Sequence, residues 1–70
     1  MDIYQQIAEL AAELHNARLT KAERQATIRQ LHELQHDIEL AEVDAVDHGD
    51  SAVADALFQQ WSSIEQVLTA

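Results

Sequence analysis

The residues of this chain best suited to chemistry form the run His32-Glu33-Leu34-Gln35-His36, which fits the H-E-x-x-H pattern of zinc metalloproteases. On a helix, the two histidines share one face and can bind one zinc ion, while Glu33 can act as base on a bound water. Such a site also needs a third protein ligand, a substrate-orienting strand and a cleft. Glu39 is only one turn away and His48 is three turns further along, so neither suits the third position. We therefore predict no catalytic residues, with metal binding through this motif as an alternative function.

Two further metal patterns fail at the level of the sequence. The E-x-x-H spacing of residues 33–36 occurs once, whereas di-iron helical bundles need it twice. The acidic residues around Gly49 suggest a calcium loop, but Val46 and His48 fall at positions that require oxygen ligands. With no cysteine and one glycine, the chain also has no disulfide, thiolate site or phosphate-binding glycine loop. We predict no cofactor, no resident metal and no enzymatic activity.

Helix-start and helix-stop signals divide the chain into three elements. Thr20 and Glu23 form a capping box, and Gly49 suits the residue just past a helix end. Asp2 is a candidate cap for a first helix, and Asp50 or Ser51 for a third. The sequence therefore predicts an all-α fold with amphipathic helices at about 3–17, 21–47 and 51–68, arranged as helical hairpins around a long central helix. We expect the first helix to end near Ala17, with Asn16 in a left-handed conformation.

The central helix has more apolar surface than one neighbour can cover. One face is predicted to receive the first helix and comprises Thr27, Ile28, Leu31, Leu34, Ile38, Ala41 and Ala45. A second, less regular stripe comprises His32, His36, Leu40 and Val43. Because two apolar faces require two neighbours, we predict a homodimer whose interface includes His36, Leu40 and Val43.

The third helix carries most of the aromatic bulk. Its apolar residues follow a near-heptad spacing, and we expect the adjacent aromatic pair Phe58 and Trp61 to lie in the core. The apolar positions are Val53, Ala54, Leu57, Phe58, Trp61, Ile64, Val67 and Leu68.

The negative charge of the chain lies in its second part. The net charge is −9, and no lysine or arginine follows Arg29, whereas nine acidic residues do. Such a surface repels phosphate backbones and anionic lipid, so we expect no direct nucleic-acid or membrane binding and instead a basic protein partner. The predicted partner-binding residues are Arg18, at the tip of the first turn, and Glu39, Glu42, Asp44, Asp47 and Asp50.

The charged residues at each end of the central helix have the sign that the helix dipole disfavours. Lys21 and Arg24 lie in its first turn and Asp44 and Asp47 in its last, and the helix dipole disfavours both placements. Antiparallel pairing of two central helices about a two-fold axis would bring these opposite charges together.

Residues 1–70 thus read as a single acidic helical interaction domain. The chain has no basic amino-terminal region and no apolar run of membrane-spanning length, so we expect a cytoplasmic protein. The predicted function is binding and inhibition or sequestration of a basic partner, such as a DNA-binding transcriptional regulator, in the manner of phage inhibitors, anti-activators or antitoxins. A secretion-system adaptor or co-chaperone and a purely structural oligomer are alternatives.

Overall fold

The computed structural model describes residues 2–70, which form three helices and no strand. Helix α1 spans Ile3–Leu14, α2 spans Lys21–Asp47 and α3 spans Ser51–Thr69. The predicted all-helical class is therefore confirmed for these residues, while Met1 of the predicted 1–70 domain lies outside them. The bounds of α2 match the prediction and those of α3 differ by one residue.

The helix boundaries follow from local capping chemistry. The Thr20 hydroxyl accepts a hydrogen bond from the Glu23 backbone N–H at 3.1 Å, and the Glu23 carboxylate accepts one from the Thr20 N–H at 3.2 Å. This confirms the capping box. Gly49 has φ 72° after the end of α2, and Asp50 caps α3 by accepting from the Val53 N–H at 3.3 Å.

The predicted end of α1 at Ala17 is wrong, because the helix ends at Leu14. No non-glycine residue in 2–70 has a positive φ, so the left-handed conformation expected of Asn16 is wrong as well. Asn16 instead accepts a hydrogen bond from the Arg18 N–H on its side chain at 3.0 Å and one from the Leu19 N–H on its carbonyl oxygen at 3.1 Å. These local bonds satisfy the backbone in a turn and so compete with another turn of helix.

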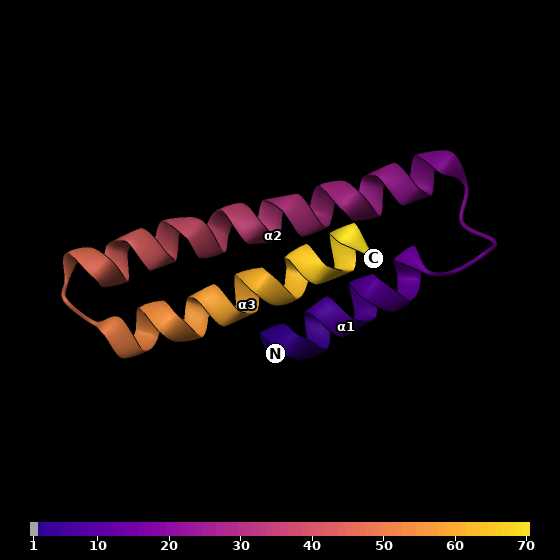
Figure 1. Cartoon of the computed structure of the whole chain (residues 1–70). Helices are drawn as coiled ribbons and strands as arrows, with labels where there is room; N and C mark the ends of the chain where they lie inside the picture. The colour runs from indigo at the N-terminus through magenta and orange to yellow at the C-terminus, as the bar shows by residue number, and fades with distance from the viewer. Residues whose placement is uncertain (1) are drawn as a thin grey trace.

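The molecule is elongated, with extents of 45 × 22 × 17 Å. Figure 1 shows α3 running back along α2 from the α2–α3 turn, with α1 beside the part of α3 that leads to the C-terminus. All three helices contact one another, so three layers meet where α1 lies. Near the α2–α3 turn only α2 and α3 are present, and each covers one face of the other (Figure 1).

The core lies where the three helices meet. Leu31 and Ile64 are completely buried, at 0% exposure. They form one cluster with Ile7, Leu10, Leu14 and Ile38. Gln35 is also buried, and its side-chain N–H groups donate to the Glu65 carboxylate at 3.0 Å and the Trp61 carbonyl at 3.4 Å. Paired in this way, the amide avoids the cost of an unsatisfied buried polar group.

Two burial predictions are wrong. Ala41 belongs to the face predicted to receive α1 but is exposed, six residues before the end of α2. Figure 1 shows only α2 and α3 near that end. Phe58, predicted to lie in the core, is 55% exposed and lines an open hollow with Glu39, Glu42 and Trp61. Trp61, its partner on the helix surface, is half-buried.

Candidate protein-binding site at the acidic end

The part of the molecule built by α2 and α3 alone combines apolar and acidic surface. We call residues 39–58 the acidic end, since they contain six carboxylates and no lysine or arginine. Among residues 2–70, six large hydrophobic side chains are exposed, and five of them belong to this segment at 45–61% exposure. These five are Leu40, Val43, Val46, Val53 and Phe58. Two packed helices share only one interface, and this explains why so much apolar surface stays uncovered here.

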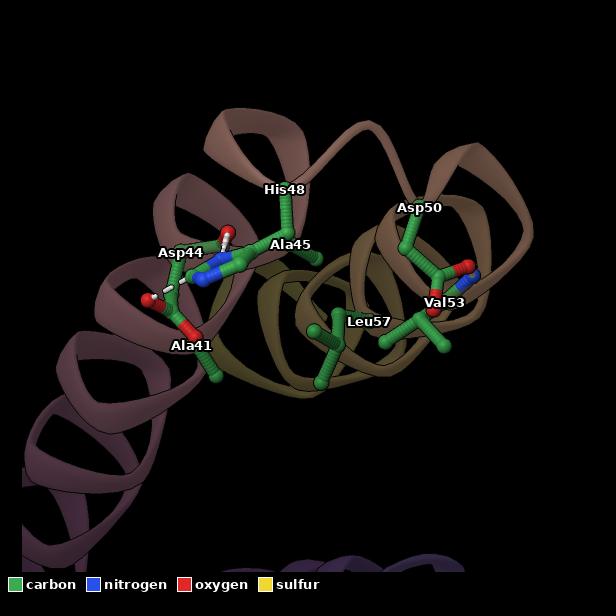
Figure 2. A pocket seen from close by; sticks show the side chains of 7 residues that line it. All are labelled: Ala41, Asp44, Ala45, His48, Asp50, Val53 and Leu57. Carbon is green, nitrogen blue, oxygen red and sulfur yellow. Dashed lines mark hydrogen bonds and ion pairs between the residues drawn. The ribbon is translucent and has the colours of Figure 1, made fainter.

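A shallow cleft lies between the helices beside the α2–α3 turn (Figure 2). The side chains of Ala41 and Ala45 from α2 and of Val53 and Leu57 from α3 form its apolar part. Asp44, His48 and Asp50 add a polar rim. The cleft therefore offers apolar contact bordered by two carboxylates.

The rim residues have local partners that hold them in place. Nδ1 of His48 lies 2.8 Å from the Asp44 carbonyl oxygen and 3.5 Å from the Asp44 carboxylate, as the dashed lines in Figure 2 show. Asp50 caps α3 and is thereby fixed at the mouth of the cleft. Of the predicted partner-binding residues, Asp44 and Asp50 thus come together in this cleft.

A second hollow brings together Glu39, Glu42 and Phe58 of the acidic end with Trp61, which lies three residues beyond it on α3. The Trp61 indole N–H donates to the Glu39 carboxylate at 2.8 Å, and the Phe58 and Trp61 rings stack at a centroid distance of 6.4 Å. Glu39 therefore serves α2–α3 packing, because it satisfies the polar edge of a half-buried indole. Glu42 is half-buried beside the Trp61 indole, and among the residues described it makes no hydrogen bond to that indole.

The predicted dimer residues lie on the side of α2 that faces away from α3. Leu40 and Val43 are 58% and 60% exposed, and His36 is exposed with Nδ1 4.0 Å from the Glu39 carboxylate. We call His36, Leu40 and Val43 the outer face. Asp47, the last residue of α2, is also exposed.

Arg18 lies apart from the other predicted partner-binding residues. It belongs to the α1–α2 connection, at the opposite end of the molecule from the α2–α3 turn (Figure 1). The structure thus separates the predicted site into an acidic end and a distant arginine, and a single contact patch does not include both.

Contacts within the chain partly explain why α2 has a cation in its first turn, where the helix dipole disfavours it. The Arg24 guanidinium donates to the Leu14 carbonyl at 3.1 Å, so this cation occupies the negative end of the α1 dipole. Hydrogen bonding by the Thr20 side chain, and secondly by its backbone, holds the pKa of Glu23 below its usual value. The sequence pattern within α2 alone did not indicate the contact between Arg24 and α1, since it joins residues of two different helices.

His32, Glu33 and His36 of the H-E-x-x-H run lie on the exposed side of α2. Arg29, His32, Glu33, His36 and Asp37 line one shallow hollow there. Within residues 2–70, no three His, Asp or Glu side chains are arranged to hold a metal ion.

Comparison of the chain with protein-family models, with curated proteins and with solved structures found no match. The helices of residues 2–70 also lack the combination of length and hydropathy that crossing a bilayer requires.

Proposed function

We propose that this chain is a cytoplasmic, non-enzymatic interaction domain that binds a basic protein surface through its acidic end. The observation that carries the proposal is the joint presence of six carboxylates and five exposed large hydrophobic side chains within residues 39–58. Apolar contact supplies affinity, while the negative field favours a cationic partner and accelerates encounter. Nucleic acid and anionic membranes are repelled by the same field.

A basic partner surface is often one that binds nucleic acid, because such surfaces carry lysine and arginine for phosphate contacts. The proposed role is therefore inhibition or sequestration of a DNA-binding regulator, as phage inhibitors, anti-activators and antitoxins do. Occupation of the partner's basic surface by the acidic end would compete with DNA for the same side chains.

We further propose that the chain acts as a homodimer of its helical hairpins through the outer face. Arg29, His36, Leu40, Val43 and Asp47 follow one another at helical spacing on α2. Antiparallel pairing about a two-fold axis level with Ile38 sets Leu40 against His36 of the second copy and Arg29 against Asp47. This pairing buries Leu40 and Val43 of each chain and brings opposite charges together, and it leaves Val46, Val53 and Phe58 of the acidic end exposed for the basic partner.

The partner proposal is tested by affinity capture with the full chain and a charge-neutralised variant. Glu42→Gln, Asp44→Asn and Asp47→Asn are combined, because these residues neither cap a helix nor bond to Trp61. Neutralisation of three carboxylates elsewhere, at the exposed residues Glu9, Glu13 and Glu33, supplies the control matched in charge.

We expect a basic protein to be retained by the natural chain and the control, and lost by the neutralised variant. The purified captured protein should then bind DNA less well in fluorescence anisotropy when the natural chain is added. Equal retention by the natural chain and the neutralised variant would contradict the proposal. For the dimer, Val43→Asp should lower the mass found by sedimentation equilibrium, and an unchanged mass would exclude the outer face as the interface.

A further inference from the structure

The apolar seam between α2 and α3 continues beyond the region that α1 covers. On α2 the seam advances in alternating steps of four and three residues through Thr27, Leu31, Leu34, Ile38, Ala41, Ala45 and His48. Thr27, Leu31 and Ile38 are buried and Leu34 is half-buried, whereas Ala41 and His48 are exposed and line the cleft of Figure 2 together with Ala45, which is 7% exposed. On α3 a matching seam starts at Val53 and Leu57, which also line the cleft, and continues to the buried Ile64. One continuous surface therefore packs against a third helix along part of its length and is open along the rest.

The third helix of this bundle is shorter than the seam it packs against. Ile7, Leu10 and Leu14 of α1 share the core cluster with Leu31, Ile38 and Ile64. Figure 1 shows α1 beside the part of α3 that is remote from the α2–α3 turn. The cleft thus occupies the position that a third helix would take near the turn.

We infer that the cleft binds a basic amphipathic helix of a partner protein, which completes the three-helix packing at the acidic end. This inference rests on the proposed function and names the part of the acidic end that receives the partner. Ala41 and Ala45 have small side chains, so a helix can approach the floor of the cleft closely. The distance from Ala41 to His48 along α2 is about 10 Å, or two helical turns.

Charge determines which helix fits. Asp44 and Asp50 border the cleft, Asp47 and Asp55 lie nearby in the sequence, and the acidic end has no lysine or arginine. A cationic helix neutralises these groups when it docks, whereas an acidic or neutral one leaves them unpaired. Lysine or arginine side chains on the flanks of the partner helix would reach Asp44 and Asp50.

The helices of a second copy lack these properties. The segment Ile3–Leu14 contains Glu9 and Glu13 but no lysine or arginine, and Ser51–Thr69 contains no cation either. The Lys21–Asp47 helix has cations in its first part, but of the large apolar residues there Leu31 is buried in the core and Ile28 is half-buried against it, so only the small Ala22 and Ala26 are exposed. A helix from a different protein therefore complements the cleft better than a helix of a second copy does. The proposed dimer uses the separate outer face.

The test uses the full isotope-labelled chain and three synthetic helical peptides. The first has leucine at the a and d positions of its heptads and lysine elsewhere. The second contains the same residues in scrambled order, and the third has glutamate in place of lysine. Amide chemical shifts of the chain are followed during titration, and affinities are measured by calorimetry.

Two pairs of variants locate the contact. Ala41→Trp fills the cleft, and its matched control Ala22→Trp adds the same side chain at an exposed alanine outside the cleft. Asp44→Lys reverses a rim charge, and Asp37→Lys reverses an exposed carboxylate seven residues earlier on α2. Circular dichroism verifies that each variant keeps its helices.

We expect only the basic amphipathic peptide to shift Ala41, Ala45, Val53 and Leu57 in a saturable manner. Ala41→Trp and Asp44→Lys should each weaken binding by roughly tenfold, while the two controls stay within about twofold. Shifts centred on Leu40, Val43 and Phe58, or equal binding of the scrambled peptide, would overturn the cleft assignment and leave the proposed function standing. Failure of every cationic peptide to bind would overturn both.

Discussion

Truncation of the same side chain at two positions of α2 would test how this small protein is stabilised. Leu31 is completely buried among all three helices, whereas Leu40 is 58% exposed on the outer face. Leu31→Ala removes fully buried methyl groups and leaves a cavity, with an expected loss of about 2.7–5 kcal/mol in the free energy of unfolding. Leu40→Ala removes atoms already in contact with water and should change that free energy by less than about 0.5 kcal/mol in the monomer.

The size of the chain makes this difference easy to observe. A 70-residue domain has a total stability of about 4–10 kcal/mol. Leu31→Ala should therefore remove about a quarter or more of the stability and lower Tm by roughly 11–40 °C. Ile64→Val is a milder change at the other completely buried residue and should cost about 0.5–1.5 kcal/mol in the free energy of unfolding. This variant replaces Leu31→Ala in the test if Leu31→Ala does not fold.

The assay is urea unfolding followed by far-ultraviolet circular dichroism, with Tm measured in parallel. Both leucine variants are studied at a protein concentration low enough to keep the chain monomeric. At higher concentration Leu40→Ala should also become destabilising, because it weakens the proposed dimer. Equal losses for the two leucine variants at low concentration would refute the assignment of Leu31 to the core and of Leu40 to the surface.

Three further predictions concern caps and the α2–α3 contact. Thr20→Ala should lower the free energy of unfolding, measured in urea, by about 1 kcal/mol. The Thr20–Glu23 pair should also make this free energy depend on pH. Because the folded pKa of Glu23 lies below its usual value of 4.5, its contribution is present above that pH and is lost as pH falls through the folded pKa. Glu23→Gln should accordingly lose less stability than the natural chain on acidification, and parallel pH profiles would contradict this. Gly49→Ala should cost about 1 kcal/mol in the free energy of unfolding, because φ is 72° and an L side chain is strained in this left-handed region. A Cβ would meet nothing within 4 Å, so backbone strain accounts for the cost, and Gly49→Asn should cost less because asparagine tolerates this conformation better. A neutral effect of Gly49→Ala would show that strain is absent. Glu39→Ala should cost about 0.5–1.5 kcal/mol and change Trp61 fluorescence, whereas Glu39→Gln keeps an acceptor for the indole N–H. Indistinguishable fluorescence of the two Glu39 variants would argue against this hydrogen bond.

Local signals predicted the helices of this protein well. The capping residues act on backbone groups only a few residues away, so their effect can be predicted without the tertiary structure. These residues are Thr20, Glu23, Gly49 and Asp50. The end of α1 was predicted less well, because Asn16 can bond the backbone of a turn as readily as it can follow a helix end.

The candidate site was only partly predictable for a related reason. The cation-free composition and the surplus apolar residues of α2 are properties of the sequence, and they indicated an acidic surface with exposed Leu40 and Val43. The cleft between Ala41, Ala45, Val53 and Leu57 depends on the length of α1 and on which part of α3 it packs against. The periodicity of α2 is the same in its covered and its open parts, so it does not indicate where the third helix stops.

The amino-acid sequence by itself determined three helices, their caps and the side of each helix that prefers apolar surroundings, because these depend on interactions within one or two turns. Only the tertiary structure decided that Gln35 is buried, that Phe58 is exposed and that Arg24 caps α1. Burial depends on what lies opposite a residue: α3 covers Gln35 and α1 supplies the acceptor for Arg24, whereas no other helix covers Phe58.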